Sequence, residues 1–150
     1  MVWGRLKNIQ KMPNLTIKEV TIQHVHQLWP YIEPFIVSAL EHSQGEYTIE
    51  EARVFVANGQ WSTVVAMDDE GIRGAALVTY YNRPRDRVAF VVAIGGILVS
   101  NRDTWAQFEG IMRLNGATYL EGAARESIAR LWSRYGMKTK YAIVGKNLNF

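Results

Sequence analysis

The longest apolar run in the sequence, Val88–Val99, contains two adjacent glycines, and it predicts a buried strand because it is too short to cross a bilayer. A polar joint, Ser100–Asp103, follows it. Apolar residues then recur at helical spacing over Thr104–Leu114, where Asn115 and Gly116 give the stop signal. The remaining pattern predicts a short strand, a second helix and a closing strand: Ala117–Glu121, Arg125–Tyr135 and Met137–Val144.

The N-terminal half begins with an alternating segment, Leu15–Thr21, which predicts a strand. Ile22–Leu40 has helical spacing but contains Pro30 and Pro34. Because proline costs about 3 kcal/mol inside a helix, we expect two helical pieces, the second starting near Pro34. A capping box, Thr48–Glu51, predicts a third helix, which ends at Asn58 and Gly59.

Two further strands with turn residues between them fill the middle of the chain. They are Ser62–Met67 and Ile72–Tyr81, joined by a hairpin at Asp68–Gly71, and a second hairpin at Asn82–Asp86 leads into the apolar run. The predicted order is therefore β-α-α-β-β-β-α-β-α-β. This order predicts an α/β fold with a mixed, mostly antiparallel central sheet and helices on both faces.

The chain length of 150 residues suits one domain, which we place at residues 14–150, behind a basic N-terminal arm at residues 1–13. The 17 basic and 14 acidic residues give a net charge of +3. The basic residues are scattered, so we interpret them as solvated surface and do not expect a nucleic-acid partner. The absence of cysteine fits a reducing compartment. With no secretion signal in view, we expect a cytoplasmic protein without a membrane partner.

The segment Tyr119–Met137 resembles the closing pattern of the GCN5-related N-acetyltransferase (GNAT) family. In that pattern a strand ends in an acidic or polar residue, a helix carries a small apolar run that ends in Leu-Tyr, and a Gly-Phe pair follows. The element order over Leu15–Val144 is similar to the family's, and compact phage-encoded members share the Glu-Gly-x-x-Arg run that begins at Glu121. A viral origin would place the protein in the host cytoplasm or in the virion.

The resemblance implies acetyl-CoA or another acyl-CoA as the donor, with the thioester arm between the fourth and fifth strands. The residues it assigns to the donor are Ile97, Leu98, Val99, Arg102, Thr104 and Arg125. The glycine pair Gly95-Gly96 could form the bulge that separates these strands in the family, or could simply permit close packing. Arg125 lies at the start of the last helix, where a cation needs a partner. We favour Glu121 as that partner, and a ligand phosphate and another protein are the two alternatives.

Two departures from the family pattern make the donor motif degenerate. Aligning Arg102 with the first residue of the pyrophosphate loop places Trp105 and Gln107 where the family has glycine or alanine. A tryptophan there would fill the space that phosphates need. Trp132 replaces the tyrosine that protonates the leaving thiolate in many members, and an indole N–H has no useful acidity.

Tyr135, one helical turn after Trp132, could replace that acid, although a core role is the favoured interpretation. Glu121 is our candidate general base, with Glu41 and His42 as alternatives. No metal-ligand spacing is present.

Two functions therefore stay open. One is an N-acyltransferase that carries an acyl group from acyl-CoA to an amine, whose identity the sequence does not give. The other is a catalytically inactive GNAT-fold protein that acts as a phage virion or assembly component, bound to other proteins or to further copies of itself.

Overall fold

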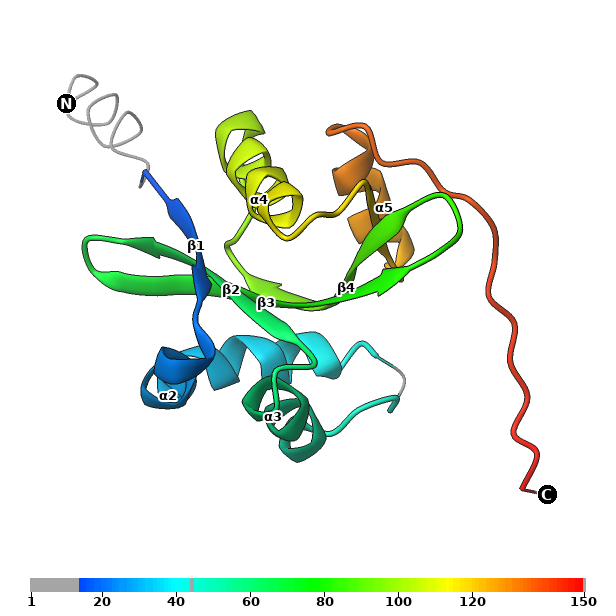
Figure 1. Ribbon diagram of the computed structural model, residues 1–150, viewed down its shortest axis with the longest axis horizontal. Helices are drawn as coiled ribbons and strands as arrows, with labels where there is room; N and C mark the ends of the chain where they lie inside the picture. The colour runs from blue at the N-terminus through cyan, green and yellow to red at the C-terminus, as the bar shows by residue number, and fades with distance from the viewer. Residues whose placement is uncertain (1–13, 44, 150) are drawn as a thin grey trace, which may run out of the picture.

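A five-stranded sheet in the order β1-β2-β3-β4-β5 lies at the centre of the computed structural model, which describes residues 14–43 and 45–149 (Figure 1). Strands β1 to β4 are antiparallel, and β5 pairs with β4 in parallel. The strands are β1 Thr16–Val20, β2 Ser62–Asp68, β3 Gly71–Asn82, β4 Arg87–Gly96 and β5 Tyr119–Gly122. This confirms the predicted α/β class and the three-strand antiparallel meander. The predicted arm, residues 1–13, lies outside the described residues.

Helices cover both faces of the sheet (Figure 1). They are α2 Ile22–Leu40, α3 Ile49–Ala57, α4 Arg102–Leu114 and α5 Glu126–Ser133. Helices α2 and α3 pack on one face with Val65 and Leu77, while α4 and α5 pack on the other with Val64 and Val78. The central strands therefore have buried residues on both faces, which explains their continuous apolar runs.

Helix α2 is continuous over Ile22–Leu40, so the predicted break at its two prolines was wrong. Its buried residues, Val25, Trp29, Ile32 and Ile36, form one stripe against the sheet. Pro30 and Pro34 lie on the exposed face. There water can satisfy the carbonyl groups that lose a helical hydrogen bond, and packing of the apolar stripe offsets the cost of the prolines.

The capping box predicted at Thr48 and Glu51 is present. Helix α4 begins at Arg102, two residues before the predicted start at Thr104, because Asn101 and Thr104 form a second capping box. Strand β4 stops at Gly96, before the predicted end at Val99, because Gly96 has a φ of +71° and the next N–H, of Ile97, donates to the Arg73 carbonyl.

The predicted closing strand, Met137–Val144, does not form. Residues 137–149 are extended but belong to no strand, and β5 is the last strand of the sheet. β5 has four residues, so it offers a short edge on which to add a strand. Among the described residues, no helix is long and apolar enough to cross a membrane.

Candidate functional site

The parallel ladder between β4 and β5 is short, and we call the unpaired stretch that follows it the opening. Pairing runs from Val88 with Tyr119 to Val91 with Gly122 and then stops. On its other side, β4 shifts register against β3, since Leu77 pairs with Ala93 but Val78 pairs with Val91. Val92 is therefore the extra residue of a β-bulge. Beyond the bulge, residues 93–96 of β4 stay paired with β3 but have no partner in β5.

The glycine pair at the end of β4 serves packing and turning, and the register shift lies nearer the middle of the strand. A Cβ atom added to Gly95 would lie 2.1 Å from the Phe35 carbonyl oxygen of α2. The α2 backbone therefore crosses this strand at a distance that only glycine allows. Of the two interpretations left open for Gly95 and Gly96, the structure supports close packing.

The N-terminus of α4 follows the opening and is capped by its own side chains. The Thr104 hydroxyl accepts hydrogen bonds from the N–H groups of Ser100 and Asn101, at 2.9 and 3.1 Å, and the Asn101 side chain accepts from the Thr104 N–H at 2.8 Å. Thr104 is buried. Arg102 and Asp103 are exposed, and their N–H groups, at the first two helical positions, have no carbonyl partner within the helix.

Three aromatic side chains, Trp105, Trp132 and Tyr135, form a cluster that joins α4 to α5. The Trp105 ring stacks on Tyr135 with 4.9 Å between centroids and an angle of 13° between planes, and it lies 6.4 Å from Trp132. Trp132 also packs against Gly122, at the end of the β4–β5 ladder. Trp105 is 5% exposed, and its Nε1 is buried with no partner among the described residues. This aromatic cluster thus stands beside the opening.

Gln107, the second residue that departs from the family's loop, ties α4 to the edge of the sheet. Its Oε1 accepts from the Ile17 N–H at 2.9 Å, and its Nε2 donates to the Leu15 carbonyl at 3.2 Å. It also donates to Asp103 at 3.0 Å. Gln107, which replaces the glycine or alanine of the family's loop, therefore joins α4 to the backbone around β1. The sequence alone does not show this role, because it depends on how α4 packs against β1.

Glu121 lies in a network of cations at the end of β5. Arg83 donates to both of its carboxylate oxygens, at 2.9 and 2.7 Å, and the Tyr81 hydroxyl donates at 3.0 Å. Lys140 Nζ is 3.5 Å from Oε2. The hydrogen bonds from Arg83, the largest cause, hold the pKa of Glu121 below its usual value.

The predicted ion pair between Glu121 and Arg125 is absent, because Glu121 pairs with Arg83 and Lys140 instead. Arg125 is the exposed N-cap residue of α5, and its side chain makes no capping hydrogen bond. Arg83 comes from the β3–β4 hairpin and Lys140 from residues 137–149. Sequence reasoning missed both of these partners, since neither is near Glu121 along the chain.

A cavity of about 770 Å³, which we call the β5 cavity, brings the two predicted catalytic residues together. Glu121 and Tyr135 both line it, with β5, α5 and the extended residues that follow α5. The predicted donor residues are placed elsewhere: Ile97 is 54% exposed, Leu98 is buried in the core, Val99 is half-buried, and Arg102 and Arg125 are exposed at the starts of α4 and α5.

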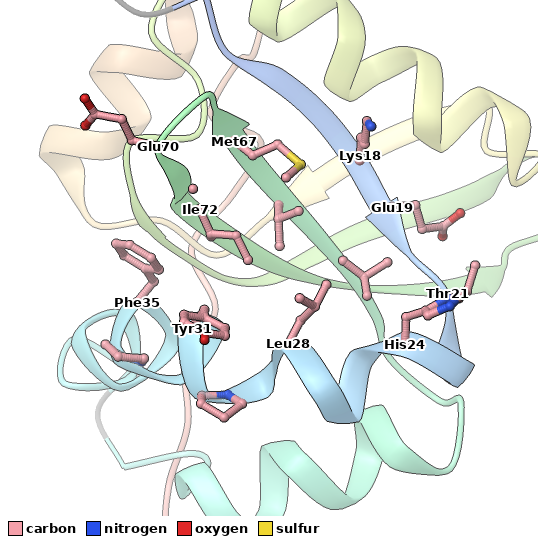
Figure 2. A pocket seen from close by; sticks show the side chains of 15 residues that line it. Lys18, Glu19, Thr21, His24, Leu28, Tyr31, Phe35, Met67, Glu70 and Ile72 are labelled. Carbon is pink, nitrogen blue, oxygen red and sulfur yellow. The ribbon is translucent and has the colours of Figure 1, made fainter.

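A second cavity of about 730 Å³ lies between β1 and α2 (Figure 2). Leu28, Tyr31 and Phe35 of α2 face Met67 and Ile72 of the β2–β3 hairpin across it (Figure 2). No predicted site residue lines this cavity. In the part of the chain that the structure describes, no group of His, Asp and Glu side chains could hold a metal ion.

These features are those of the GNAT fold: a meander, a bulged fourth strand that separates from the fifth, and a helix N-terminus beside the opening. Comparison with solved structures agrees. The aminoglycoside N-acetyltransferase AAC(6')-Iy in complex with CoA is 10% identical, with a TM-score of 0.65 over 92% of this chain and 97% of that one. The ribosomal-protein-alanine N-acetyltransferase of Brucella melitensis biovar Abortus 2308 is 11% identical, with a TM-score of 0.63 over 89% and 99%.

An aminoglycoside acetyltransferase from an uncultured soil metagenomic sample, in complex with trehalose, is similar in the same way. It is 10% identical, with a TM-score of 0.63 over 90% of this chain and 97% of that one. At these identities the likeness establishes the fold. No family model and no curated protein matches the sequence. The comparisons give no support to a phage virion or assembly component.

Proposed function

We propose that this protein binds an acyl-CoA thioester at the opening between β4 and β5 and transfers the acyl group to an amine. The observation that carries the proposal is the free edge of β4, residues 93–96, beyond the bulge at Val92. An extended arm that contains amide groups can add to such an edge through main-chain hydrogen bonds, as an added strand does. The neighbours named as acetyltransferases, one of them in complex with CoA, support this use of the opening.

The residues around the opening fit such a donor in part. The free N–H groups at the start of α4 and the Arg102 guanidinium would hold its phosphates. The buried Trp105 Nε1–H has no acceptor among the described residues, and it would donate a hydrogen bond to a carbonyl oxygen of the arm. Ile97 N–H is already bound to the Arg73 carbonyl, which leaves Leu98 and Val99 as the backbone donors toward the thioester carbonyl. Two residues oppose the binding of this donor. Asp103 places a negative charge in the first turn of α4, and the Trp105 side chain fills space that the phosphates need.

The donor would supply an activated acyl group, and the chain would supply proton transfer and orientation. Tyr135 remains our candidate acid, since its hydroxyl belongs to a side chain that lines the β5 cavity. Glu121 remains the candidate base, but its lowered pKa makes it a weak one, because a base matched to an amine needs a higher pKa. Its network also gathers Arg83 and Lys140 at the cavity, where they would disfavour a cationic acceptor.

Calorimetry with CoA, acetyl-CoA and pantetheine tests the donor site. We expect CoA to bind, and Arg102→Ala to weaken CoA about tenfold, the loss of one charge-assisted hydrogen bond, while pantetheine binding is unchanged. Arg113→Ala, at the exposed C-terminal end of α4, is the matched control and should change neither. Acyl transfer to a panel of amines can be followed by release of the CoA thiol, with no background because the chain lacks cysteine.

The proposal is overturned if neither CoA nor acetyl-CoA binds at about 1 mM, which corresponds to a binding free energy weaker than about −4 kcal/mol. The proposal is also overturned if the Trp105→Ala variant binds CoA and the natural protein does not, since the aromatic cluster would then block the donor in the natural protein.

A further inference from the structure

The cavity between β1 and α2, which we call the β1–α2 cavity, has apolar walls that solvent reaches (Figure 2). In these walls Tyr31 is 64% exposed, and Leu28, Phe35, Met67 and Ile72 are half-buried. Exposed apolar surface that is gathered in one hollow marks a binding site, whereas single scattered side chains need no explanation. None of the described residues that line this cavity also lines the β5 cavity, so the two are separate surfaces.

The described chain begins at Asn14, at one end of this cavity. Thr16, the first residue of β1, pairs with Met67, and Met67 lines the cavity. The N-terminal arm, residues 1–13, therefore joins the described chain beside the β1–α2 cavity.

Two of the three surfaces around the start of β1 are already occupied. The free edge is closed there, because Gln107 accepts from the Ile17 N–H at 2.9 Å and donates to the Leu15 carbonyl at 3.2 Å. On the face toward α4, the side chains of Leu15 and Ile17 are buried in the core. Thr16 and Lys18 alternate with them, so they belong to the face toward α2, and both are exposed. The face toward α2, where the β1–α2 cavity lies, is thus the open one.

The arm is long enough to fill the cavity after turning back. The side of the cavity formed by α2 runs from His24 to Phe35, a helical rise of about 17 Å. Thirteen extended residues span up to about 45 Å. The reversal would fall at Pro13 and Asn14, and proline and asparagine are residues that turns favour.

We propose that the β1–α2 cavity binds the N-terminal arm of its own chain. The arm carries apolar side chains that match the apolar walls: Val2, Trp3, Leu6, Ile9 and Met12. Because the arm is tethered at one end of the cavity, its local concentration there is on the order of millimolar, so modest apolar contacts are sufficient to hold it. The arm of a second copy would lack this tether.

Thiol labelling of the full chain tests whether the arm is bound, and the cysteine-free sequence makes each introduced thiol unique. Each labelling rate is divided by the rate for the same variant unfolded in urea, which removes differences in thiol pKa. We expect Leu6→Cys to react with a maleimide at least about tenfold more slowly than Leu148→Cys, at a position that is 85% exposed. Adding Tyr31→Asp, which places a charge in the cavity wall, should restore the fast rate. Equal rates for the two thiols, or a slow rate that Tyr31→Asp leaves unchanged, overturn the proposal.

Disulfide cross-linking locates the arm without a charged substitution. Leu6→Cys should form a disulfide with Tyr31→Cys within one chain at least about tenfold faster than with Val37→Cys. Val37 is the matched control, because it is an exposed residue of the same helix that does not line the cavity. Equal rates for the two pairs overturn the proposal. So does a disulfide that joins two chains, since the occupant would then be the arm of a second copy.

Discussion

Gly95 allows the backbone of α2 to cross β4, and its replacement by alanine is predicted to destabilise the protein strongly. The added Cβ would lie 2.1 Å from the Phe35 carbonyl oxygen and 2.9 Å from its carbonyl carbon. An ordinary contact needs at least 3.4 Å, so α2 must move by about 1.3 Å. Ile32 and Ile36, both fully buried, would move with it. Overpacking of this kind costs about 1–3 kcal/mol.

Gly110 offers the matched control, because the same substitution there should have the opposite sign. It lies inside α4, and a Cβ added to it meets nothing within 4 Å. Alanine is favoured over glycine in a helix interior by about 0.5–1 kcal/mol. We therefore expect Gly110→Ala to stabilise the protein while Gly95→Ala destabilises it.

Urea denaturation measures both effects as changes in the midpoint at constant slope. In thermal unfolding, Gly95→Ala should lower Tm by roughly 2–12 °C for a chain of this size. A Gly95→Ala variant as stable as the natural protein would refute the packing argument. If that variant kept its stability but lost CoA binding, the glycine would belong to the donor site instead.

Two further predictions concern side chains that join distant elements. Gln107→Ala should lower the free energy of unfolding by about 1–3 kcal/mol in urea denaturation, because the Ile17 N–H and the Leu15 carbonyl lose their partner, and an unchanged midpoint would contradict this role. Hydrogen bonds from Arg83 hold the pKa of Glu121 below its ordinary value of 4.5, so the stabilisation they give is complete above about pH 4.5 and is lost as pH falls through the lower folded-state pKa. The Tm of the natural protein should therefore fall more steeply from about pH 5 to about pH 3 than that of Glu121→Gln, and parallel curves would show that the pair contributes nothing.

Local signals in the sequence determined most of the elements. The capping boxes at Thr48 and Asn101, the hairpin turns and the helical stripe of α4 act over a few residues, so their outcome does not depend on the rest of the fold. The element order was sufficient to predict a mixed sheet with helices on both faces. The sequence also predicted that Trp105 and Gln107 depart from the pyrophosphate loop of the GNAT family.

Long-range packing decided the remainder. Burial of one stripe of α2 kept that helix continuous through two prolines, although its local propensity predicted a break. The partners of Glu121 come from a hairpin 38 residues before it and from residues 137–149, so no spacing in the sequence could predict them. The same holds for residues 137–149 themselves. Their pattern is that of a strand, but a strand forms only when it pairs with an edge, and the tertiary structure leaves these residues unpaired.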